Sequence, residues 1–202
     1  RNPSNPFLYL NRSTTQSEMI DFVSSIDNSF QRIAIESDPA NRLKTQSTRT
    51  YNYDEAIGDL NKAIKLLPDF AYSYYNRANL YCLSGQMSEA LEDYTAVLKV
   101  DSTYAYAYYN RALLRSEIGD VNNAIQDFDQ VLEMNPDNIL IYFNRGLLKM
   151  EIKDYEGAYN DFSQSISIYP DFVKAYLARA ATSMDMRDYD AAEKDRYKAE
   201  EI

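Results

Sequence analysis

Apolar residues recur at three- and four-residue steps along much of the chain, which is the spacing of one face of an α-helix. One such run covers residues 105–118 and stops at Gly119, and a second covers residues 122–134 and stops just before Pro136. Glycine and proline are the residues expected at helix ends, and proline disfavours helical geometry in the residue before it. The pattern therefore predicts two helices joined by a short turn.

The same pattern returns with a period of 34 residues. With Ala71 as position 1, the blocks are 71–104, 105–138, 139–172 and the incomplete 173–202. Position 8 is always small (Ala78, Ala112, Gly146, Ala180), and so is position 20 (Ala90, Ala124, Ala158, Ala192). Aromatic residues fill position 4 (Tyr74, Tyr108, Tyr142, Tyr176) and position 24 in three blocks (Tyr94, Phe128, Phe162). Small residues let two helices approach and aromatics fill the space beside them, so we expect stacked helix pairs with positions 4 and 8 in the core.

Together with proline at position 32 (Pro136 and Pro170), these columns resemble the tetratricopeptide repeat family over about residues 51–202. The resemblance implies an all-α fold, an α-solenoid of stacked antiparallel helix pairs wound into a right-handed superhelix. Three departures from the family pattern are Ser102 at position 32, arginine at position 7, and Arg196 at position 24 of the last block.

The start of the chain is less regular. Residues 51–70 match the second helix of a repeat, whose first helix should lie near the polar residues 37–50. Either that helix is lost or shortened, or the sequence joins segments that are not contiguous in the full protein. Residues 15–50 read as an N-terminal helix plus a polar linker, either a degenerate repeat or a capping helix. Residues 1–14, which contain two prolines, are predicted to be an extended segment.

The arginine at position 7 lies at the edge of the packed side of its helix, where an unpaired charge is costly. Sixteen residues later an aspartate always stands at position 23. We therefore predict an Arg–Asp pair within each block. The pairs are Arg77–Asp93, Arg111–Asp127, Arg145–Asp161 and Arg179–Asp195.

The resemblance also implies that the first helices line a concave groove, where some family members bind extended peptides through a ladder of asparagines. An amide can donate and accept, so it can bind a peptide backbone of any sequence. The alternative is that these asparagines are solvent-exposed polar residues that bind no ligand. The predicted groove residues occupy positions 2, 5, 6 and 9: Tyr72, Tyr75, Asn76, Asn79, Tyr106, Tyr109, Asn110, Leu113, Leu140, Phe143, Asn144 and Leu147.

Composition narrows the chemistry. The chain has no histidine and one cysteine, Cys82, which excludes a Ser–His–Asp triad, a histidine-ligated zinc and an internal disulfide. We expect no enzyme activity, no metal and no cofactor. The net charge of −10 argues against nucleic acid, and no apolar run approaches the roughly 20 residues of a membrane-spanning helix. An aromatic, amide-rich groove with an acidic border suits a partner protein or peptide carrying hydrophobic and basic side chains.

The carboxylate clamp of chaperone-binding family members needs three cations, but Tyr75, Leu140 and Asn144 stand in those places, so we reject that ligand. The main hypothesis is a non-enzymatic scaffold that binds a peptide or partner segment in the groove. Two others stay open: the repeats form the assembly or regulatory portion of a larger protein, or residues 1–14 mediate self-association into a homo-oligomer. The chain starts at Arg1 without a signal-peptide pattern, which indicates a trimmed start and leaves the compartment unknown.

Overall fold

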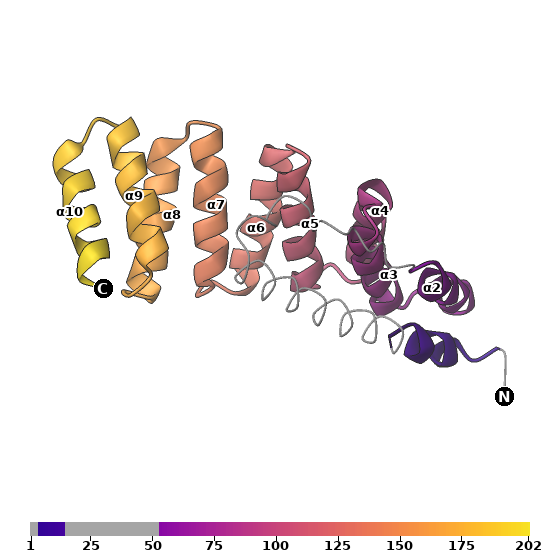
Figure 1. Cartoon of the computed structure of the whole chain (residues 1–202). Helices are drawn as coiled ribbons and strands as arrows, with labels where there is room; N and C mark the ends of the chain where they lie inside the picture. The colour runs from indigo at the N-terminus through magenta and orange to yellow at the C-terminus, as the bar shows by residue number, and fades with distance from the viewer. Residues whose placement is uncertain (1–3, 15–52) are drawn as a thin grey trace, which may run out of the picture. The chain divides into compact units, whose positions relative to one another are not determined.

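The computed structural model describes residues 4–14 and 53–202, shown in Figure 1. The chain divides into two compact units, Arg1–Ser102 and Thr103–Ile202. All regular structure in the described residues is helical, which confirms the predicted all-α repeat fold.

The first unit contains α2 (Asp54–Leu66), α3 (Ala71–Leu83) and α4 (Met87–Val100). Helices α3 and α4 pack as one pair, and α2 packs against α3. The second helix expected within residues 51–70 is therefore present as α2.

The second unit contains three helix pairs that follow one another along the chain, and α7 to α10 stand side by side in Figure 1. The pairs are α5 (Ala105–Glu117) with α6 (Val121–Met134), α7 (Ile139–Glu151) with α8 (Tyr155–Ile168), and α9 (Val173–Asp185) with α10 (Tyr189–Glu201).

The small residues at positions 8 and 20 are buried in every pair, and so are the aromatic side chains at position 24. Gly146 shows why one position 8 is glycine, because an added Cβ would come within 2.7 Å of Cε1 of the Phe162 ring. The position 4 tyrosines are only partly in the core. Tyr176 is buried, whereas the tyrosines of the other three blocks are half-buried.

The turn inside each pair has a left-handed residue at position 15. Gly85 and Gly119 have φ values of 76° and 80°, which glycine adopts without penalty. Lys153 and Arg187 adopt the same conformation, with φ values of 63° and 64°. A non-glycine residue in this region costs on the order of 1 kcal/mol, so the turn geometry is imposed by the packing of the two helices.

The prediction that residues 1–14 are extended is wrong, because residues 6–14 are helical. Pro6 is the first helical residue, where its missing N–H costs nothing. Asn5 precedes it, and its Oδ1 accepts a hydrogen bond from the Phe7 N–H at 3.0 Å, as an N-cap does. The proline therefore starts a helix instead of preventing one. The helix and polar linker predicted for residues 15–50 lie outside the described residues.

Candidate functional site

The predicted Arg–Asp pairs are confirmed in all four blocks. In each pair the arginine Nε donates to one carboxylate oxygen and Nη2 donates to the other. The Nη2–Oδ1 distances are 2.6 Å for Arg77–Asp93, 2.7 Å for Arg111–Asp127, 2.6 Å for Arg145–Asp161 and 2.7 Å for Arg179–Asp195. The four aspartates are buried, so these two-pronged bonds stabilise charges that would be costly alone.

In three of these arginines the remaining guanidinium nitrogen, Nη1, donates to a residue earlier in the chain. Nη1 of Arg145 donates to Asp129 at 2.6 Å, and Nη1 of Arg179 donates to Ser163 at 3.0 Å. Arg77 donates in the same way to Asn61. Each acceptor lies 16 residues earlier, on the second helix of the preceding pair. One arginine therefore connects the second helices of two consecutive pairs.

The position 4 tyrosines complete this arrangement. Each guanidinium lies over the ring of the tyrosine three residues earlier, at 5.6–5.8 Å from the ring centroid. Burial disfavours the charged form of Arg145, but its hydrogen bonds and attraction to Asp161 and Asp129 outweigh this and raise the pKa of its guanidinium above the ordinary value. This arginine system is structural, as expected.

A fifth pair of the same kind was missed by the sequence reading. Arg12 donates from Nε and Nη2 to the two carboxylate oxygens of Asp59, and its guanidinium lies 5.8 Å from the centroid of Tyr9. Residues 9–13 read YLNRS, which is the YYNRA motif of residues 74–78 with two substitutions. Leu10 is buried with Ile57 and Leu60 of α2. Residues 6–14 thus occupy the place of the first helix paired with α2.

The predicted groove residues of the first unit have different environments. Tyr72 is exposed, and the ring of Tyr75 rests on that of Tyr94 at 6.1 Å between centroids. The Oδ1 of Asn79 accepts a hydrogen bond from the Tyr94 hydroxyl at 2.6 Å, so this amide has a structural role. The Nδ2 of Asn76 is buried and has no hydrogen-bond acceptor among the residues that the structure describes.

In the second unit four predicted residues line a single pocket of ≈ 430 Å³. Tyr106, Tyr109 and Asn110 come from α5 and Leu140 comes from α7. Tyr106 is 71% exposed and Leu140 is 55% exposed. No charged residue contributes to the lining. The remaining lining residues are Ala105, Val131, Asn135, Asn138 and Ile141.

The other predicted residues of this unit do not line the pocket. Leu113 and Leu147 are exposed at position 9, and Asn144 is half-buried. Phe143 packs between Phe162 and Phe172, with ring centroids 5.7 Å and 5.0 Å away. The structure therefore brings together four of the predicted groove residues around one cavity.

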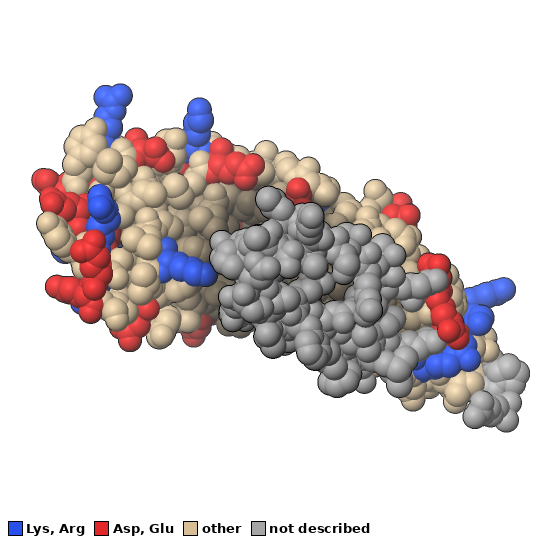
Figure 2. All heavy atoms as spheres, viewed as in Figure 1, with Lys and Arg blue, Asp and Glu red and all other residues tan. Residues whose placement is uncertain are grey.

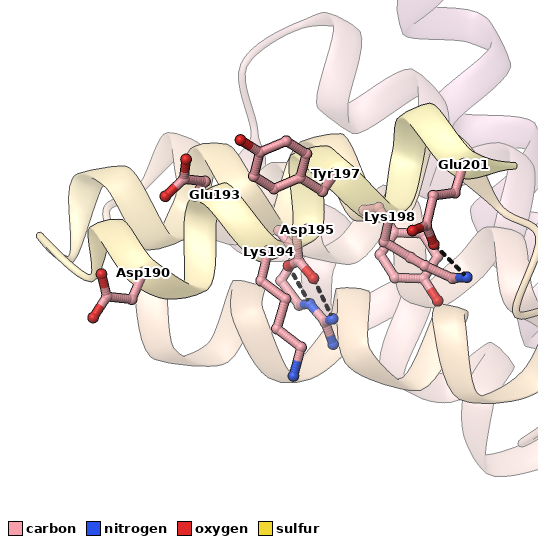
Figure 3. A pocket seen from close by; sticks show the side chains of 9 residues that line it. Asp190, Glu193, Lys194, Asp195, Tyr197, Lys198 and Glu201 are labelled. Carbon is pink, nitrogen blue, oxygen red and sulfur yellow. Dashed lines mark hydrogen bonds and ion pairs between the residues drawn. The ribbon is translucent and has the colours of Figure 1, made fainter.

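A larger pocket of ≈ 660 Å³ lies beside α9 and α10, away from all predicted site residues. Its lining is strongly charged, and Figure 2 shows acidic and basic side chains gathered around this helix pair. Figure 3 shows Asp195 facing the guanidinium it binds and Lys198 facing Glu201, which it contacts at 3.2 Å. Because several lining charges already pair with one another, we favour the smaller, uncharged pocket as the ligand site.

None of the helices in the described part of the chain is long and apolar enough to cross a membrane. Within residues 4–14 and 53–202 there is also no cluster of His, Cys, Asp or Glu side chains suited to a metal ion.

Comparisons with known proteins agree with this fold. Family profiles described as tetratricopeptide repeats match residues 105–138 and 139–172, and one described as TPR repeat matches residues 52–84 and 78–119. Curated protein sequences gave no match.

Several solved structures are similar. A crystal structure of MamA is 25% identical, covers 73% of this chain and 86% of its own, and has a TM-score of 0.69. For MamA 41-end from Desulfovibrio magneticus RS-1 the identity is 17%, the coverage 73% and 84%, and the TM-score 0.67. YrrB, described as "a TPR protein with an unusual peptide-binding site", is 17% identical, with coverage of 83% and 89% and a TM-score of 0.67. The profiles and these neighbours support a protein-interaction scaffold, and the chain belongs to the tetratricopeptide repeat family.

Proposed function

We propose that this protein is a non-enzymatic scaffold whose second unit binds an extended peptide, or a segment of a partner protein, across α5 and α7. The observation that carries the proposal is the pocket in which Tyr106, Tyr109, Asn110 and Leu140 meet. A surface with exposed aromatic and apolar side chains beside amides is typical of protein-binding sites.

The chemistry of the pocket suits a peptide. Asn135 offers an amide group that can donate to a backbone carbonyl and accept from a backbone N–H. The net charge of −10 favours a partner with basic residues beside its apolar ones.

The structural neighbour YrrB supports the choice of ligand class, because YrrB is described as having a peptide-binding site. The hypothesis of self-association through residues 1–14 has less support. Leu10 and Arg12 of that segment already pack on α2 of the same chain.

The proposal is tested by selecting dodecapeptides from a random phage-displayed library on the full chain and measuring their affinity by fluorescence anisotropy. Tyr106→Ala should weaken the selected peptides at least about tenfold, because it removes an exposed aromatic anchor. The matched control is Tyr189→Ala, since Tyr189 is 60% exposed on α10 and lines neither pocket.

Both variants should keep the melting temperature of the natural chain, because both side chains are largely exposed. If no peptide is selected, or if Tyr189→Ala weakens binding as much as Tyr106→Ala, the proposal is wrong.

A further inference from the structure

The residue just before each first helix, block position 34, is aromatic at three places and an asparagine at one. The column reads Phe70, Tyr104, Asn138 and Phe172. The exception, Asn138, is the one that lines the pocket between α5 and α7.

At Phe70 and Phe172 the aromatic side chain at position 34 packs against rings of the first helices. In the second unit, the ring of Phe172 lies 5.0 Å from that of Phe143, a position 5 residue. In the first unit, the ring of Phe70 lies 5.8 Å from Phe7 and 6.2 Å from Tyr72, in edge-on contacts. The chain's own rings thus occupy these places.

Asn138 leaves the corresponding place open. Its Oδ1 accepts from the Ile141 N–H at 3.3 Å, so the short side chain serves as the N-cap of α7. Tyr109 stands at position 5, like Phe143, but Asn138 gives it no ring at position 34 to pack against. The result is a cavity of ≈ 430 Å³ beside Tyr109.

We propose that this cavity receives an aromatic side chain of the partner, which takes the place of the missing aromatic residue at position 34. The inference rests on the proposed function and names the side chain that its ligand must carry. A partner ring would lie against Tyr109 as Phe172 lies against Phe143. All nine lining residues are uncharged, so a charged side chain would lose its hydration without gaining a counter-charge. The amide of Asn135, another lining residue, suits a phenol hydroxyl or an indole N–H.

The direct test titrates the full chain with N-acetyl-tyrosinamide, and separately with N-acetyl-leucinamide, and follows backbone amide signals by NMR. The tyrosine probe should shift the signals of Tyr106, Asn110 and Leu140, with an affinity at least about fivefold higher than that of the leucine probe. Equal affinities of the two probes, or shifts elsewhere only, overturn the inference.

Three variants test whether the missing ring at position 34 is what allows the tyrosine probe to bind. Asn138→Phe supplies the ring from within, as at Phe70 and Phe172, and should weaken the tyrosine probe at least about tenfold. Asn138→Ala removes the cap but leaves the cavity open, and should bind the probe within about twofold of the natural chain. Asn160→Phe, an exposed position on α8 outside the pocket, is the matched control for adding a ring and should have no effect.

These outcomes separate the two proposals. Library-selected peptides that lose affinity in Tyr106→Ala but bind Asn138→Phe normally would leave the peptide-binding scaffold standing and overturn the aromatic pocket. A tyrosine probe that binds as described, in a chain that selects no peptide, would leave the pocket standing without the proposed peptide function.

Discussion

The helix pair at the start of the chain and the pair α5–α6 contain the same motif and the same ion pair, but their connections differ greatly. Arg12 and Asp59 are 47 residues apart, whereas Arg111 and Asp127 are 16 residues apart. The first pair therefore has 31 more residues between its arginine and its aspartate. Because the pairing is the same in both, it is set by how the two helices pack and does not depend on a short turn.

The two ion pairs differ in their surroundings. The Arg12 side chain is 51% exposed, whereas that of Arg111 is 12% exposed. Asp127 also binds Nη1 of Arg115 at 2.7 Å, while the additional contact of Asp59 is a longer one to Lys62, at 3.4 Å. The ion pair of α5–α6 is thus more buried, and the second contact of its aspartate is shorter.

The largest effect is expected from removing the shared carboxylate. Asp127→Ala leaves the guanidinium groups of Arg111 and Arg115 without their common acceptor and should lower the free energy of unfolding by about 3–5 kcal/mol. Asp59→Ala should cost clearly less, because Arg12 is solvated. Urea unfolding of the full chain, followed by circular dichroism at the helix band, measures both. An equal or larger loss in Asp59→Ala would remove the distinction between the two pairs.

A smaller effect is expected from making the first connection like the second. Replacing residues 15–52 with residues 114–120, the last turn of α5 and its connection to α6, should keep the Arg12–Asp59 pair and raise the free energy of unfolding by about 1.5 kcal/mol. The gain follows from the lower entropy cost of closing a shorter segment. Loss of the helical signal of residues 6–14, checked by NMR, would show that these residues are not equivalent to the first helix of a repeat.

The smallest effect is expected from lowering the pH, which removes the contribution of the Asp59 carboxylate to stability. Hydrogen bonds from Arg12 hold the pKa of the Asp59 carboxyl below its ordinary value of 3.8. Since the folded state favours the ionised form, this contribution to stability is complete above about pH 4 and disappears as the pH falls through the lowered pKa. A carboxyl-carbon NMR titration should show this lowered pKa in the natural chain. Arg12→Ala should return it toward the ordinary value, and an unchanged titration would contradict the assignment.

Much of the fold could be predicted because its determinants recur in the sequence. The small residues at positions 8 and 20, and the aspartates at position 23, each answer a local packing or charge requirement. Residues 6–14 escaped prediction for two physical reasons. Pro6 was read as a helix breaker although proline is favoured at a first helical position, and the YLNRS motif stands outside the 34-residue register.

The candidate site was predicted in part. Tyr106, Tyr109, Asn110 and Leu140 meet at one pocket, but Asn79 is held by the hydroxyl of Tyr94, which phenylalanine at position 24 of the next two blocks lacks. The pocket itself depends on Asn138, whose significance comes from a missing ring. The sequence shows that position 34 lacks an aromatic residue here, but it does not show that a cavity results. The cavity could be found only in the three-dimensional structure.

The backward hydrogen bonds of Arg145 and Arg179 have a consequence for how the second unit responds to salt. In a repeat protein each helix pair contacts only its neighbours. The bond from Arg145 to Asp129 therefore couples one helix pair to the pair before it, and so does the bond from Arg179 to Ser163. The first coupling joins two opposite charges, with Asp129 partly exposed, and the second joins a charge to a neutral hydroxyl, so added salt should weaken the first more than the second. Amide-proton exchange of α7–α8 and of α9–α10 at low and high salt measures this difference.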